Sequence, residues 1–280
     1  MIGTIELARR IEAAETRLSV AMADVTCAGG DPTAFALRVG SGVAVYCGPR
    51  APMTKVIGLG IAEPITDADI DRVEAAYGPT GEHPGWEVAS LGDFASIRRL
   101  EARSYRLQRI ELVLGRDLSR PTLIDPPPSD IKVTRGTEEQ WSRIAVAGFG
   151  AAETVAGRDA PAELYDESTL ERVVRQLAGV PDVRHYVGFV NGVAAGAASG
   201  RVDAGVFQLC GAATLPEYRR LGVQSALLGA RLADARAESC DLAVVTVEPG
   251  SRSQANVQRR LFAPLYSRLV YAKEAPTRDS

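Results

Sequence analysis

Histidine, cysteine and long apolar runs are scarce in this chain of 280 residues. The 2 histidines and 4 cysteines stand singly, without a Cys-x-x-Cys pair, which argues against a zinc framework or a Cys-His centre. No apolar run is long enough to cross a bilayer, and Glu6 with two arginines stands where a signal peptide has its apolar core. We therefore expect a cytoplasmic protein with reduced, buried thiols and with no metal or membrane partner.

An excess of basic residues is also missing. The net charge is −3, whereas nucleic-acid-binding proteins carry a basic excess that neutralises phosphates, so no nucleic-acid partner is expected. With 46% hydrophobic and 24% charged residues, the composition is that of an ordinary globular protein, and the length suits two domains.

A proline-rich segment divides the chain. Residues 119–129 include Pro126, Pro127 and Pro128, and consecutive prolines can neither continue a helix nor lie in a central strand. We therefore predict a first domain at 1–118, a linker at 119–129 and a second domain at 130–280.

The stretch 214–237 predicts a strand end, a turn and a helix. Arg219 and Arg220 precede the helix, although the partly positive N-terminus of a helix favours acidic residues. Two cations there indicate a multiply charged anion that the free N–H groups of residues 221–225 also bind, and Gly222 would let it approach the backbone. A solvated arginine pair is the alternative. The predicted anion-binding residues are Arg219, Arg220, Leu221, Gly222, Val223, Gln224 and Ser225.

Residues 216–224 resemble the pyrophosphate-binding signature of the GNAT superfamily of acetyl-CoA-dependent N-acyltransferases, Arg/Gln-x-x-Gly-x-Gly/Ala. Arg219 and Gly222 match it, and Gln224 replaces the last small residue. Residues 249–262 resemble the next segment of the family, a helix carrying an Asn before Gly-Phe, with Asn256 as the Asn and Leu261 in place of the Gly.

The resemblance implies that acetyl-CoA lies along residues 214–225 with Asn256 on the far side of its arm. An amine would attack the thioester directly in a ternary complex, with backbone donors for the developing oxyanion at Ala213, Thr214 and Leu215. Many family members have a Tyr that acts as the general acid where this chain has Val257. Tyr266 is the substitute predicted here. Glu248 at the exit of the strand 242–247 is either the base or only a surface residue before a Pro-Gly turn, and water relays are the alternative to both.

The first half of the chain has the same order of elements as the part after residue 183: two or three strands, a helix, a strand, a helix and a strand. It therefore looks like a diverged copy of the second half. Ser104-Tyr105 before a last strand parallels Leu261-Phe262. The helix start of this copy carries Asp67, Asp69 and Asp71, which would repel a pyrophosphate. We expect an α/β (α+β) protein of two GNAT-like domains, each a mixed, mostly antiparallel sheet flanked by helices, the first degenerate and structural or substrate-shaping.

The predicted activity is transfer of an acetyl group from acetyl-CoA to a primary amine of a small molecule or peptide, bound where the domains meet. The sequence does not give the oligomeric state, for which a homodimer is one alternative. Phe149 and Tyr165 either line the acceptor pocket or only pack. The alternative is a non-catalytic acyl-CoA-binding or regulatory protein, which Val257 suggests. A nucleotide-phosphate enzyme is disfavoured, because no Gly-Lys-Ser/Thr follows a glycine loop.

Overall fold

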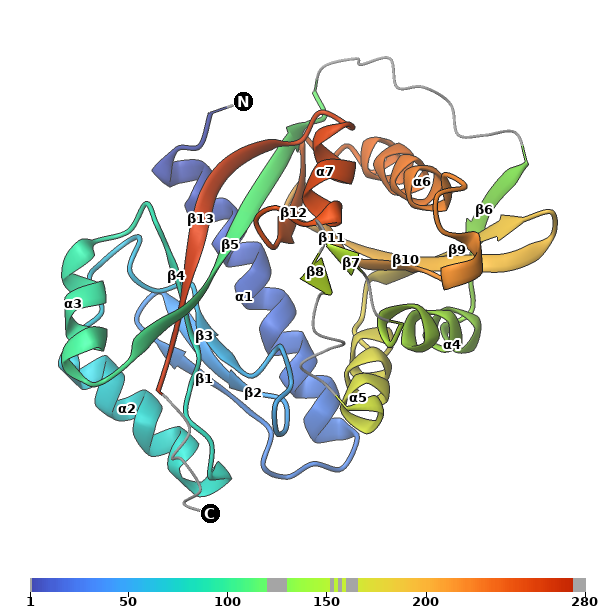
Figure 1. The fold of residues 1–280 in the computed structure, drawn as a ribbon. Coiled ribbons are helices and arrows are strands. Elements are labelled where there is room, and N and C mark those ends of the chain that lie inside the picture. Colours follow the sequence, from blue (N-terminus) through green and yellow to red (C-terminus); the bar gives the residue numbers. More distant parts are fainter. Residues whose placement is uncertain (1, 120–129, 152–153, 156–157, 160–165, 274–280) are drawn as a thin grey trace. The chain divides into compact units, whose positions relative to one another are not determined.

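The computed structural model describes residues 2–119, 130–151, 154–155, 158–159 and 166–273 (Figure 1). The chain divides into two compact units. The N-terminal unit comprises residues 2–113 with 264–273, and the C-terminal unit comprises residues 114–263. Apart from Ser119, the predicted linker lies outside the described residues.

The N-terminal unit combines three helices with a mixed sheet. Its strands follow the order β1-β2-β3-β4-β13-β5, with antiparallel pairing of β1 with β2, β2 with β3 and β4 with β13, and parallel pairing of β3 with β4. The elements are α1 (Ile5–Ala28), β1 (Phe35–Val39), β2 (Gly42–Tyr46), β3 (Lys55–Ile57), α2 (Asp67–Tyr77), a 3-10 turn (Gly78–Thr80), β4 (Trp86–Ala89), α3 (Phe94–Ala102), β5 (Arg106–Asp117) and β13 (Ala263–Ala272).

The C-terminal unit has the strand order β12-β11-β10-β9-β6, to which the last residues of β5 are added beside β12. Antiparallel pairing joins β6 with β9, β9 with β10 and β10 with β11, whereas β11 pairs parallel with β12. The elements are β6 (Ile131–Arg135), α4 (Glu138–Phe149), β7 (Thr154–Val155), β8 (Arg158–Asp159), α5 (Glu167–Ala178), β9 (Val183–Val190), β10 (Val193–Asp203), β11 (Val206–Thr214), a 3-10 turn (Pro216–Tyr218), α6 (Val223–Ala237), β12 (Leu242–Val247) and α7 (Arg252–Gln258).

Helices cover both faces of the C-terminal sheet. Tyr186 and Ala198 pack with α6, whereas their neighbours Val187 and Ala197 pack with Trp141 and the helices α4 and α5. Successive residues of a strand point to opposite faces, so α6 lies on one face and α4 with α5 on the other. The predicted α+β class, with mixed and mostly antiparallel sheets flanked by helices, is thereby confirmed.

Matching helix ends support the interpretation of the chain as two related copies. Ser104 after α3 and Leu261 after α7 have positive φ values of 68° and 64°. The next residue in each case donates its N–H five residues back, Tyr105 to Leu100 at 3.0 Å and Phe262 to Val257 at 3.2 Å. This is the Schellman motif, in which glycine usually takes the left-handed position, so Leu261 adopts the conformation of the glycine it replaces.

The strand β13 completes the N-terminal unit although it comes last in the sequence. It pairs antiparallel with β4, with Arg268 opposite Ala89, and Ser90 donates its N–H to the carbonyl of Ser267 at 2.8 Å. The sequence-based boundaries placed residues 264–280 in the second domain, whereas the described residues after 263 group with the first unit. Sequence pattern predicts a strand here without indicating which sheet it joins.

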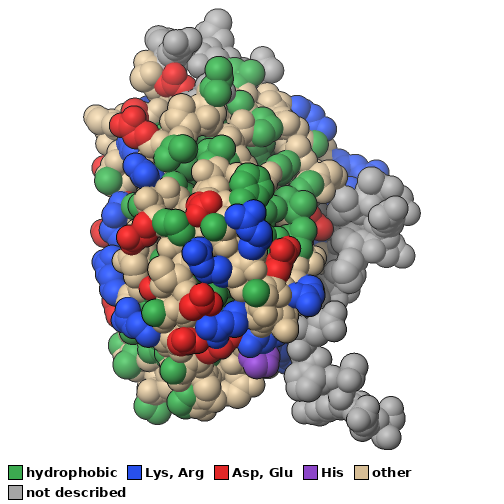
Figure 2. All heavy atoms as spheres, turned by 90° about the vertical axis from the view of Figure 1, so that its left-hand side faces the viewer, with side chains coloured by type: hydrophobic (Ala, Val, Ile, Leu, Met, Phe, Trp, Pro, Cys, Tyr) green, Lys and Arg blue, Asp and Glu red, His purple; other side chains and the backbone are tan. Residues whose placement is uncertain are grey.

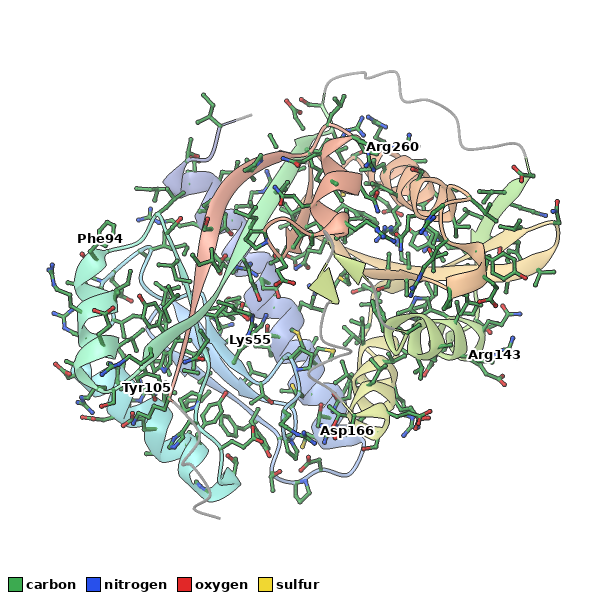
Figure 3. All side chains as sticks on the ribbon, viewed as in Figure 1. Lys55, Phe94, Tyr105, Arg143, Asp166 and Arg260 are labelled. Carbon is green, nitrogen blue, oxygen red and sulfur yellow. The ribbon has the colours of Figure 1, made fainter. Side chains whose placement is uncertain are left out.

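Buried charges hold α1 against this sheet. The Arg268 side chain is 2% exposed and lies 2.8 Å from the Glu12 carboxylate and 3.7 Å from that of Glu87. Lys55 lies 3.2 Å from Glu87 and 3.0 Å from Glu15, and Figure 3 shows it in the interior of the unit. Burial by itself would lower the pKa of Lys55, but the carboxylates of Glu87 and Glu15 outweigh this and raise it.

We predict that Arg268→Met lowers the free energy of unfolding of the N-terminal unit by ~3–5 kcal/mol, because the buried Glu12 carboxylate loses the cation that lies 2.8 Å from it. Arg109→Met is the matched control: Arg109 is half exposed and pairs with Glu111, so its loss should cost below about 1 kcal/mol. Denaturant unfolding of both variants measures the difference. Equal losses in the two variants would contradict the structural role of the buried network.

Candidate functional site

The site begins where β11 and β12 part. Their parallel pairing covers three residue pairs and ends at Gln208 opposite Val244. Directly afterwards the register between β10 and β11 slips, because Cys210 and Gly211 both face Ser199. Gly211 has a φ of 86°, as expected for a glycine in a β-bulge. Beyond Gln208 and Val244 no further residue pair joins the two strands in the described part of the chain, so their facing edges part.

The helix α6 starts without a side-chain cap. Gly222, with φ 94°, is the N-cap residue and makes no side-chain bond, whereas α1, α2, α3, α4, α5 and α7 each begin at a Thr, Asp or Ser that accepts a bond from the first turn. The N–H groups of residues 223–225 therefore receive no capping side chain. They are available to an anion.

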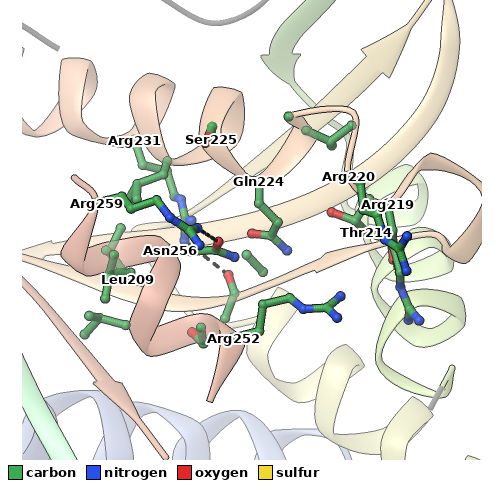
Figure 4. Close-up of a pocket in the computed structure, with 18 of the residues that line it drawn as sticks. Leu209, Thr214, Arg219, Arg220, Gln224, Ser225, Arg231, Arg252, Asn256 and Arg259 are labelled. Carbon is green, nitrogen blue, oxygen red and sulfur yellow. Dashed lines mark hydrogen bonds between the residues drawn. The ribbon is translucent and has the colours of Figure 1, made fainter. Parts of the chain in front are cut away.

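These features enclose a cavity of about 550 Å³ within the C-terminal unit. Figure 4 shows Gln224 and Arg231 entering it from α6, Arg252 and Asn256 from α7, and Arg259 from the end of α7. Among the described residues, five arginines and no Asp or Glu line the cavity, so it suits a ligand with several negative charges. The lining residues are Leu209, Gly211, Ala212, Thr214, Tyr218, Arg219, Arg220, Gly222, Val223, Gln224, Ser225, Leu228, Arg231, Val245, Thr246, Arg252, Ser253, Asn256, Val257 and Arg259.

Most of the predicted cofactor-binding residues lie in this lining: Thr214, Arg219, Arg220, Gly222, Val223, Gln224, Ser225 and Asn256. Three others do not. Ala213 faces α4, where a Cβ built on Gly148 would lie 2.7 Å from its methyl group, and Leu215 packs with the α4 and α5 core. Leu221 is 47% exposed to solvent.

Arg219 fastens the turn before α6. Its Nε lies 3.4 Å from the carbonyl oxygen of Thr214, and its Nη2 donates to the carbonyl of Ala151 at 2.9 Å. The guanidinium therefore ties the end of β11 to the segment after α4 while its charge stays beside the cavity. Arg220 next to it has a positive φ of 67°.

The two predicted acid-base residues lie outside the cavity lining. Glu248 is exposed in the turn after β12. Tyr266 is buried in the N-terminal unit, where its hydroxyl donates to Glu12 at 2.5 Å, and burial and the Glu12 carboxylate raise its pKa. This contact occupies the hydroxyl and gives the predicted acid role of Tyr266 no support. Phe149 packs with the α4 and α5 core, and Tyr165 lies outside the described residues.

Several lining residues escaped the sequence analysis. Helical spacing could have indicated Arg231, because Gln224, Leu228 and Arg231 follow the i, i+4, i+7 pattern of one helix face. Arg252 in α7 and Arg259 directly after it have no such local signal, since only tertiary packing brings α7 beside α6. Arg259 donates to the Asn256 side chain at 2.8 Å, which orients that amide at the cavity wall.

The corresponding region of the N-terminal unit is closed by its own groups. The carbonyl of Gly60, just after β3, accepts the N–H of Asp93 at 2.9 Å, and the N–H of Ile65 donates to Ser96 at 2.9 Å. Thr66 and Asp69 cap α2 reciprocally. Lys/Arg and Asp/Glu side chains are interspersed on the side of this unit seen in Figure 2.

Aspartates at the start of α2 are also paired. Arg103 lies 2.6 Å from Asp71 and 3.3 Å from Asp67. A helix start that is capped and acidic offers an anion neither free N–H groups nor a positive field. This supports the prediction that the first copy does not bind the cofactor.

Comparison with known proteins gives a family match for the second half of the chain. Residues 152–261 match the model of the acetyltransferase (GNAT) family. A GCN5-related N-acetyltransferase from Kribbella flavida is 17% identical with a TM-score of 0.63, covering 91% of this chain and 96% of that one. A tandem GNAT protein from the clavulanic acid biosynthesis pathway is 14% identical with a TM-score of 0.57, covering 91% and 89%.

A GCN5-related N-acetyltransferase from Sphaerobacter thermophilus is 15% identical with a TM-score of 0.55, covering 86% of this chain and 76% of that one. Comparison with curated proteins gives no match. The expected tandem GNAT fold is thus confirmed. Within the described ranges, no helix has the length and apolar character needed to cross a membrane.

We predict opposite effects of two alanine substitutions around α6. Gly222→Ala should lower the free energy of unfolding by about 1–2 kcal/mol, because an L-residue is strained at φ 94°. Gly229→Ala, in the same helix with no atom within 4 Å of the added Cβ, should raise it by ~0.5–1 kcal/mol. Thermal or denaturant unfolding measures both; a stabilising Gly222→Ala would contradict the described N-cap.

Proposed function

We propose that this protein is an acetyl-CoA-dependent N-acetyltransferase whose cofactor occupies the cavity of the C-terminal unit. The observation that carries the proposal is the joining, in one cavity, of the uncapped start of α6 and the parted edges of β11 and β12. Free N–H groups at a helix start bind phosphate oxygens, and the arginines around them add positive charge. Unpaired strand edges offer hydrogen bonds to the amides of a pantetheine arm.

The chemistry asked of the site is modest. A primary amine attacks the thioester carbonyl, the carbonyl oxygen becomes negative, and the thiolate of CoA leaves. The N–H of Leu215 donates to Ala195 in β10, so by strand alternation the N–H groups of Thr214 and Ala212 point to the open edge. A donor aimed at the developing oxyanion contributes on the order of 3 kcal/mol.

Proton transfer completes the reaction. The amine must lose a proton and the thiolate must gain one. Glu248 at the exit of β12 stays the candidate base, and water in the polar cavity could carry protons to and from it. Tyr266 is kept only as the weaker candidate for the acid, since its hydroxyl is engaged by Glu12.

The second candidate function is acyl-CoA binding without turnover. Val257 favours it, because an apolar side chain lines the cavity where many family members carry the acidic Tyr. Both functions require acetyl-CoA to bind. They differ in whether CoA thiol is released when an amine is added.

The first test is calorimetric titration with acetyl-CoA, followed by thiol release assays with a panel of primary amines. We expect one site per chain and release of thiol with at least one amine class. Binding without release from any amine would favour the non-catalytic alternative. Absence of binding would overturn both candidates.

Arg219→Glu should raise the dissociation constant of acetyl-CoA at least tenfold, about 1.4 kcal/mol, because it replaces a cation beside the anion-binding helix start with an anion. Arg143→Glu on α4 is the matched control: its side chain is exposed, does not line the cavity and points outward in Figure 3. It makes the same change in net charge and should leave the constant within twofold. Equal constants for both variants would contradict the assignment of the helix start.

A further inference from the structure

Arg231 is a buried cation whose hydrogen bonds within the described part of the chain go to backbone carbonyls. It lies in the middle of α6, is 4% exposed and lines the cavity. Burial lowers its pKa to about 10, so it remains charged at neutral pH. Its Nε donates to Leu227 of its own helix at 3.3 Å, and its Nη1 lies 3.2 Å from the Ser199 oxygen and 3.3 Å from the Gly211 oxygen.

The two carbonyls from different strands meet at the bulge. Ser199 belongs to β10 and Gly211 to β11, at the position where the register between these strands slips. A carbonyl of a bulged residue loses its regular partner in the ladder. The Nη1 group of Arg231 supplies a shared donor there, and the Ser199 hydroxyl adds a second tie by donating to the carbonyl of Cys210.

A hydrogen bond to the Gly211 carbonyl also fixes the N–H of Ala212. The two groups belong to one planar trans peptide and point in opposite directions, so an oxygen held toward Arg231 aims the N–H away from it. Alternation from Leu215 directs the Ala212 N–H to the open edge of β11, and Ala212 lines the cavity.

We propose that Arg231 is a positioning residue for acyl transfer: by holding the Gly211 carbonyl it aims the Ala212 N–H at the thioester oxygen. This inference rests on the proposed function. A donor displaced by about 1 Å can lose on the order of 100-fold in rate. The role therefore concerns the transition state more than cofactor affinity.

The test compares Arg231→Met with wild type. We expect kcat to fall at least 30-fold while the dissociation constant of acetyl-CoA stays within threefold. In bound acetyl-CoA labelled with ¹³C at the carbonyl, the infrared frequency should lie closer to that of free acetyl-CoA in the variant, because the thioester oxygen loses a well-aligned donor. A residue that only stabilises the fold would not move this frequency.

Arg201→Met is the matched control. Arg201 also links β10 to β11, through a 3.2 Å bond to the side chain of Gln208, but it lies on the paired side of the bulge and outside the cavity lining. It should leave kcat and the carbonyl frequency unchanged. If Arg231→Met does not fold, Arg231→Lys, which keeps the buried charge but loses the planar fork, replaces it and should show the same split.

Unchanged kcat and frequency in Arg231→Met would overturn the proposal, and so would a loss of acetyl-CoA binding or misfolding of both Arg231 variants. Failure of the proposed function is distinguishable. It appears as absent binding or turnover in the wild type, whereas the carbonyl frequency tests Arg231 in any protein that binds acetyl-CoA.

Discussion

The end of hydrogen bonding between β11 and β12 is the constraint on which the candidate site depends. A sheet interior normally pairs every backbone group, and leaving such groups unpaired is costly unless a ligand or water takes them. Here the bulge at Gly211 turns β11 away just after Gln208, and α6 and α7 bring their polar side chains over the opening. The cavity therefore lies where β11 and β12 part, and arginine side chains line it.

The two units illustrate how one fold supports opposite local chemistry. At the start of α6, Gly222 leaves the first turn without a side-chain cap among arginines. At the start of α2, a capping box closes the first turn and Arg103 pairs with Asp67 and Asp71. The difference lies in a few polar residues at a loop and a helix start. In both units these residues lie in a loop that leads from a strand into a helix.

The sequence predicted the elements well because their signals are local. The strand end, turn and helix predicted over 214–237 and the strand predicted over 242–247 agree with the observed elements. The helix start from Arg219 to Ser225 was also a contiguous pattern. What could not be predicted depends on tertiary contacts: Arg252 and Arg259 reach the cavity through the packing of α7, and Tyr266 lies on a strand whose sheet the sequence does not specify.

The position of β13 has a consequence for synthesis. Glu12 and Arg268 are separated by 256 positions, yet they form one buried ion pair. A ribosome makes the chain from the N-terminus, so α1 emerges long before the strand that neutralises its buried carboxylate. The N-terminal unit is thus begun first and completed last. Until β13 is made, the edge of β4 is open to pairing with other strands. Misassembly is therefore favoured most in the time between the synthesis of β4 and that of β13.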